Sequence, residues 1–156
     1  MAFSQWPAPA RAIAAAVQEA VAAVGARPAF EEAVAQLAAL DQAQVTVVLG
    51  SVLQMLMEET APDGLAADDV QSLLEKCVRN AAAWYPAVQV EALVIVVAGA
   101  LGMQDPDADP RIAPPVIATH AALLVHELLA VTRRPLGGYL EIALGEIARA
   151  ETIEMP

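Results

Sequence analysis

The sequence predicts an all-α fold, a single-domain bundle of about seven helices over residues 1–156. Alanine, which has the highest helix propensity of all residues, accounts for 36 of the 156 residues. Larger apolar residues recur at a spacing of three or four, and proline and glycine separate these segments. No segment combines the alternation and the turn of a β-hairpin, so strands are not expected.

Three helices are predicted in the first part of the chain. The first lies between Pro9 and Gly25, and the second begins at Pro28, because proline is favoured at the first position of a helix. Asp41, with a glutamine three residues later, has the spacing of a capping box. A third helix therefore begins there and runs to about Thr60, where a turn that contains proline and glycine follows.

The fourth helix begins at Asp68 and Asp69, since negative charge favours the N-terminal end of a helix, and ends at the segment 84–86. From Ala87 to Met103 the apolar residues occupy all sides, which predicts a helix covered on every side. The segment Leu93–Val97 alone also fits a buried strand. The length of the apolar segment and its helical neighbours favour the helix.

Residues 105–111 form an acidic linker with two prolines. Pro114 and Pro115 begin a sixth helix, which runs to about Arg133, and Pro135 separates it from a seventh. The fifth and sixth helices are expected at the centre of the bundle. The short connections make successive helices antiparallel.

Two apolar segments of the chain resemble each other. Val45–Met55 aligns with Val94–Met103 at an offset of 49 residues, which pairs Gly50 with Gly99. Such an offset is compatible with paired helical hairpins. With so few residue types involved, chance explains the likeness better.

Two ionisable residues, His120 and Glu127, lie on the apolar side of the sixth helix. At 100° per residue they point within about 20° of each other, and they lie about 10 Å apart along the axis. They do not reach each other, so each needs another partner: an arginine, a hydroxyl, water, a ligand or a second subunit. One interpretation is a ligand-binding site in which they act as acid, base or ligand. The other, which we prefer, is a pair of interhelical contacts that fix the packing.

Other possible motifs are incomplete. His126 begins a segment similar to a zinc-protease helix, but Ala130 stands where the second histidine is required. The aspartates of 105–109 have the spacing of a calcium loop, but Pro110 and Val116 replace its glycine and glutamate. No metal site and no cofactor are therefore expected.

Charge and composition exclude further classes. The chain has 19 acidic and 8 basic residues and a formal net charge of −11, and its basic residues are scattered, so nucleic-acid binding is not expected. Cys77 is the one cysteine, which excludes an intramolecular disulfide. The N-terminus lacks the features of a signal peptide, and the longest uncharged apolar run, 92–103, is too short to cross a bilayer. We expect a cytoplasmic protein that does not act at a membrane, with residues 1–8 as a flexible arm.

The leading functional hypothesis is a non-catalytic, acidic helical protein that acts through a protein partner or through self-association, for example as a homodimer. Its support is the high apolar content of 58%, which leaves apolar side chains for the surface. The alternative is a small-molecule-binding domain or a small enzyme. Its pocket would lie between the fifth, sixth and seventh helices, around His120 and Glu127.

Overall fold

A computed structural model describes residues 6–103 and 112–154, and every regular element within these ranges is a helix. The helices are α1 (Ala8–Ala22), α2 (Arg27–Ala38), α3 (Gln42–Thr60), α4 (Ala67–Ala82), α5 (Val90–Ala100), α6 (Pro114–Thr132) and α7 (Leu136–Glu154). The predicted all-α bundle is confirmed, and the segment Leu93–Val97 is helical. In the expected arm, Trp6 is partly buried against the core, while residues 1–5 lie outside the described chain.

The helices α1, α2, α3 and α6 begin at the proline and aspartate residues from which their starts were predicted. Proline occupies the first turn of α1, α2 and α6, where its missing N–H costs no hydrogen bond. The Asp41 side chain accepts hydrogen bonds from the N–H groups of Ala43 and Gln44 and so caps α3. The side-chain amide of Gln42 donates to the carbonyl groups of Leu37 and Ala38 at the end of α2 and to that of Leu40 just after it. One short connection thus satisfies the polar groups of two helix ends.

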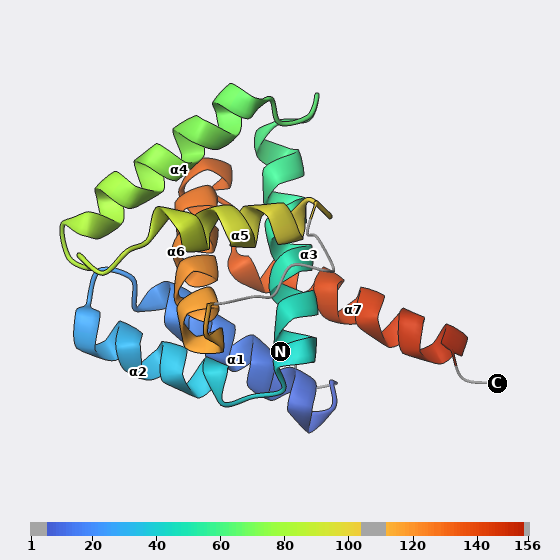
Figure 1. The fold of residues 1–156 in the computed structure, drawn as a ribbon. Helices are drawn as coiled ribbons and strands as arrows, with labels where there is room; N and C mark the ends of the chain where they lie inside the picture. Colours follow the sequence, from blue (N-terminus) through green and yellow to red (C-terminus); the bar gives the residue numbers. More distant parts are fainter. Residues whose placement is uncertain (1–5, 104–111, 155–156) are drawn as a thin grey trace.

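The helix α6 lies at the centre of the molecule and contacts α1, α2, α3, α4 and α5 (Figure 1). Its middle is almost entirely buried, and Leu124 is completely inaccessible to solvent. The helix α5 packs on both α6 and α3, so the two helices expected at the centre lie together there. The expectation that α5 is covered on every side is wrong, however. Val90 and Val94 are 52% and 46% exposed, because none of the described helices packs on that side.

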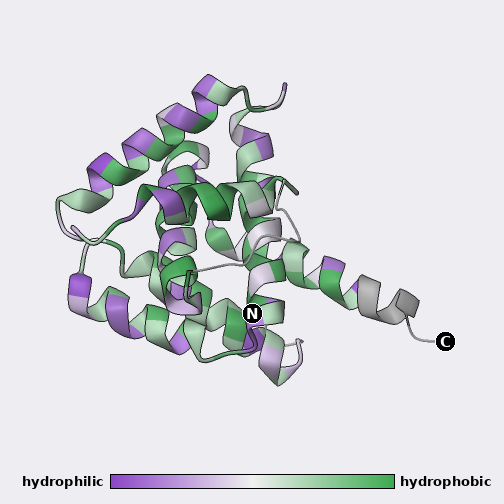
Figure 2. Ribbon diagram, viewed as in Figure 1, coloured by the Kyte–Doolittle hydropathy of each residue, from purple (hydrophilic) through white to green (hydrophobic). Residues whose placement is uncertain are grey.

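The buried apolar side chains form one cluster, to which all seven helices of the described chain contribute. Hydrophobic residues lie mainly where the helices face one another, and hydrophilic residues lie on the outer sides (Figure 2). The helix α4 contributes least, since Cys77 and Ala81 are its fully buried residues. Burial raises the pKa of the Cys77 thiol to about 12, so this cysteine is an inert core residue.

An aromatic cluster joins the start of α2 to the end of α4. The ring of Phe30 is fully buried and meets the ring of Trp84 edge to face, with 5.1 Å between their centroids. Tyr85 packs on Phe30 in a similar way, and the guanidinium of Arg27 lies 5.5 Å from the centre of the tyrosine ring. Such contacts add to the area that the rings bury.

Polar contacts attach α7 to α3. Tyr139 donates a hydrogen bond to Glu59, which also accepts one from Arg134. Further along, Ser51 donates to Glu146. Toward its C-terminal end, α7 extends away from the other helices (Figure 1).

By length and composition α6 is apolar enough to cross a membrane, and 56% of its most apolar stretch is buried among the other helices. The helices α2 and α3 pass the same test as a pair but are bent by 119° relative to each other. A helix at the core of a globular protein also has these properties.

The position of α6 predicts where truncation is most costly. We expect Leu124→Ala to lower the free energy of unfolding by about 2–5 kcal/mol, because it leaves a cavity in the core around α6. The matched control is Ile142→Ala on α7, whose side chain is 51% exposed. We expect that variant to stay within about 0.5 kcal/mol of the parent protein in urea denaturation. Equal losses for the two variants would contradict the position of α6.

Candidate functional site

His120 is buried, 1% exposed, and both of its ring nitrogens have protein partners. The backbone N–H of Gln89, at the start of α5, donates to Nε2 over 2.9 Å. Nε2 therefore carries no proton, and Nδ1 donates to the carbonyl oxygen of Val116 over 2.7 Å. The neutral imidazole is the form that fits this environment. Burial lowers the pKa of His120, and the bond to the Val116 carbonyl opposes that shift.

Glu127 is also buried, 6% exposed, but its partners come from α4. The side-chain nitrogen Nδ2 of Asn80 donates to both carboxylate oxygens, over 2.9 and 3.1 Å. The Nζ atom of Lys76, whose side chain is half-exposed, lies 3.7 Å from Oε1. The carboxylate thus ties α4 to α6 through one amide and one ammonium group.

His120 and Glu127 share one face of α6, as the helical geometry predicted, but the structure does not bring them together in one site. His120 faces the start of α5, whereas Glu127 faces the middle of α4. Each residue has the interhelical contact that the packing interpretation requires.

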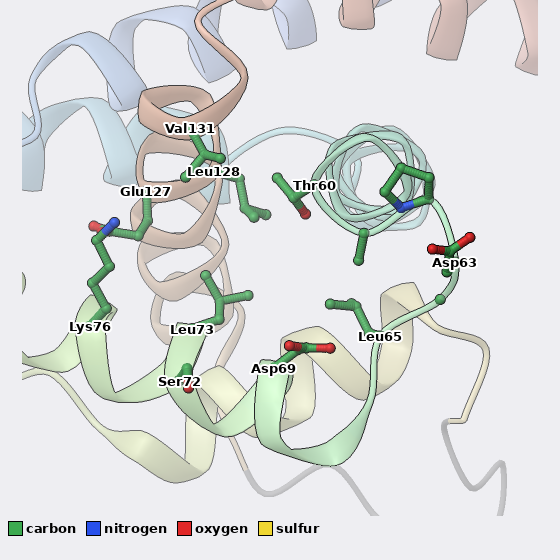
Figure 3. A pocket seen from close by; sticks show the side chains of 13 residues that line it. Thr60, Asp63, Leu65, Asp69, Ser72, Leu73, Lys76, Glu127, Leu128 and Val131 are labelled. Carbon is green, nitrogen blue, oxygen red and sulfur yellow. The ribbon is translucent and has the colours of Figure 1, made fainter.

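Glu127 also lies on the wall of a pocket of about 490 Å³, which we call the α4–α6 pocket. It lies between the end of α3, the following turn, α4 and α6, rather than between α5, α6 and α7 as the sequence analysis expected. Leu65, Leu73, Leu128 and Val131 supply apolar surface, and Asp63, Asp69, Lys76 and Glu127 supply charge (Figure 3). His120 does not line this pocket.

A second hollow, of about 310 Å³, lies between α3, α5 and α6, and we call it the apolar cleft. None of its lining residues is charged, and its walls are formed mainly by Val45, Leu49, Leu53, Ile95, Val96, Ile117, Ala118 and Ala121. Gly50 and Gly99, which the internal likeness aligns, both line it. A Cβ atom at Gly50 would meet nothing within 4 Å, so no neighbour in the described chain explains this glycine. Sequence reasoning missed the cleft, because residues of three helices form it.

Other residues considered in the sequence analysis add no site. Among the described residues, no three His, Cys, Asp or Glu side chains are arranged to hold a metal ion. His126 is exposed on the outer side of α6. The aspartates of 105–109 lie outside the described residues.

Comparison with known proteins gives no match: no protein-family model, no curated protein and no solved structure is similar to this chain.

The environment of His120 predicts a dependence of stability on pH. The lowered pKa means that the unfolded chain takes up a proton at a higher pH than the folded protein does. The contribution of neutral His120 is therefore fully present above the ordinary value of 6.5 and is lost as the pH falls below it. We expect the free energy of unfolding to fall by at most about 1.4 kcal/mol per pH unit in that range.

Urea denaturation at about pH 7.5 and pH 5.5 measures this effect. The slope should disappear in His120→Gln and persist in the control His126→Gln. A slope that is equally steep in His120→Gln would assign the effect to another group.

The pairing of Glu127 predicts a second stability effect. Glu127→Gln keeps the shape of the side chain, but it removes the charge beside Lys76 and turns an N–H group toward Asn80. We expect a loss of about 1–3 kcal/mol in the free energy of unfolding. Glu58→Gln, at an exposed position of α3, is the control and should change stability by less than about 0.5 kcal/mol. A loss no larger than that of the control would mean that the carboxylate is not held by its partners.

Proposed function

We propose that this protein is a non-catalytic binding protein that associates with a second copy of itself through the outer surface of α5. The observation that carries the proposal is an exposed apolar surface on that helix. We call this surface the α5 face, and it consists of the exposed or half-exposed residues Val90, Val94, Ile95, Ala98, Gly99 and Leu101. One charged residue, Glu91, is exposed on the same side of the helix, at its N-terminal end.

The α5 face is continuous with the apolar cleft. Ile95 and Gly99 belong to both, so the apolar surface extends from the outside of α5 inward between α3 and α6. From Val90 to Leu101 it runs about 16 Å along the helix axis. Contiguous apolar surface of this kind is typical of interfaces, and it is longer than one small ligand requires.

Charge restricts where a second copy can bind. Each chain has a net charge of −11, so two copies repel each other, and the repulsion is smallest where their facing surfaces carry few charges. The α5 face and the apolar cleft together provide such a surface. A strongly basic partner would instead be attracted to the acidic surfaces elsewhere on the molecule.

A binding role also fits the buried polar groups. Both nitrogens of His120 are engaged, Nε2 by the N–H of Gln89 at the start of α5 and Nδ1 by the carbonyl of Val116 within α6, so the imidazole is not placed to transfer protons to a substrate. Glu127 accepts hydrogen bonds from Asn80 of α4. The bond between Gln89 and His120 stabilises the position of α5 on α6, which presents the α5 face.

Sedimentation velocity over a concentration series tests the association. We expect a monomer–dimer equilibrium that strengthens with added salt, because salt screens the repulsion between the acidic chains. Val94→Glu, which adds a charge to the α5 face, should weaken the dimer at least tenfold. Ile142→Glu makes the same change on α7, at a similarly exposed position, and should leave the dimer intact.

Two results would contradict the proposal. One is a monomer at every concentration and salt level up to about 1 mM, the range of the weakest specific complexes. The other is a dimer that Val94→Glu does not weaken, which would place the interface elsewhere.

A further inference from the structure

We propose that the α4–α6 pocket binds a small molecule that carries a primary ammonium group on an apolar body, with the ammonium on the Glu127 carboxylate. This site is separate from the α5 face and does not depend on self-association. It rests on four features of the pocket: an incompletely bonded buried carboxylate, a surplus of negative charge, an apolar floor, and a loosely held internal cation.

The Glu127 carboxylate has fewer hydrogen bonds than a buried charge normally has. Its side chain is 8% exposed, and an ionised carboxylate can accept about four hydrogen bonds. One amide nitrogen, Nδ2 of Asn80, is shared between its two oxygens. The Nζ atom of Lys76 lies 3.7 Å away, beyond hydrogen-bond distance. Acceptor positions therefore remain on an oxygen pair at the pocket wall.

The charge around the pocket selects a cation. Three carboxylates, Asp63, Asp69 and Glu127, line it, and Lys76 is its one basic residue. One oxygen of Asp69 accepts the N–H of Ala66 at the start of α4, and the other is not engaged in that cap. A cationic ligand lowers the repulsion among these groups, whereas an anionic ligand raises it.

The floor of the pocket selects an apolar body. Leu65, Leu73 and Leu128 point into the space between the charged groups (Figure 3). Val131 continues this surface along α6. The volume of about 490 Å³ lies within the range of pockets that hold small organic ligands. A bare inorganic cation would leave this surface wet, so the expected ligand is an amine with several carbons.

Lys76 occupies the place of the ligand's ammonium when the pocket is empty. Its side chain is 51% exposed, so it moves into solvent at little cost. A ligand with a shorter and better placed ammonium then donates directly to Glu127. Lys76 is thus a competitor of the ligand, which gives the proposal a consequence that a purely structural ion pair lacks.

Isothermal titration calorimetry with hexylammonium, 1-hexanol and hexanoate tests the site on the full chain. The three probes share one apolar body and differ in charge. We expect hexylammonium to bind at least tenfold more tightly than hexanol, and hexanoate to bind more weakly still. Equal affinity for hexylammonium and hexanol, or tightest binding of hexanoate, would overturn the proposal.

Variants separate the roles of the two charged residues. Glu127→Gln should lower the affinity for hexylammonium at least tenfold and leave the affinity for hexanol unchanged. Circular dichroism checks that this variant is folded. Lys76→Met should raise the affinity for hexylammonium, because it removes the competing ammonium group without disturbing the contact between Asn80 and Glu127. Glu75→Gln, on the outer side of α4, is the matched control and should change nothing. Weaker binding of hexylammonium to Lys76→Met would overturn the competition between Lys76 and the ligand, and with it the proposal.

Discussion

The arrangement of helices depends on the requirement that buried polar groups find partners. The central helix α6 carries an imidazole and a carboxylate on the side that faces its neighbours. Leaving either without hydrogen bonds would cost a large share of the stability of a domain of this size. The backbone at the start of α5 satisfies the first, and the side chains of α4 satisfy the second. Apolar packing alone would tolerate many positions of α4 and α5 on α6, whereas these bonds select one.

The helix α4 shows the importance of these hydrogen bonds, because apolar burial contributes little to its attachment. Two of its residues are fully buried, whereas Val70, Leu73, Leu74 and Val78 are only partly buried against the core, and Leu73 also lines the α4–α6 pocket. Its position depends on the bond between Asn80 and Glu127 and on the aromatic cluster around Phe30 at its C-terminal end. Both attachments lie at the C-terminal half of α4, and the pocket opens beside its N-terminal half, where Asp69, Ser72 and Leu73 line it. The pocket is therefore a direct result of how α4 is held.

Much of the fold was predictable because its signals are local. Proline before a helix, Asp41 before the third helix and the spacing of apolar residues each act within a few residues of the chain. The shared face of His120 and Glu127 follows from helix geometry alone. Their partners did not follow, because Gln89 and Asn80 lie 31 and 47 residues away and no spacing rule connects them.

The sequence was least informative about surfaces formed by several helices. Apolar residues on all sides of α5 indicated complete burial, but the pattern does not show how many neighbours a helix has. The apolar cleft is built by small and aliphatic residues of three helices, so no single segment shows it. The pocket beside Glu127 was expected on the side of α5 and α7. That placement was wrong because the partners of the carboxylate come from α4.

The central position of α6 also has a consequence for the order of events during synthesis. The helices α1, α2 and α3 leave the ribosome before α6, yet each buries part of its apolar side on that helix, which begins only at Pro114. Until then the nascent chain can pair α1 with α2, but it lacks the central helix α6, on which five other helices pack. Emerging chains of this type expose apolar surface for seconds, at translation rates of about 5–20 residues per second. Until α6 has been made, the growing polypeptide therefore carries apolar surface that only its own later helices cover.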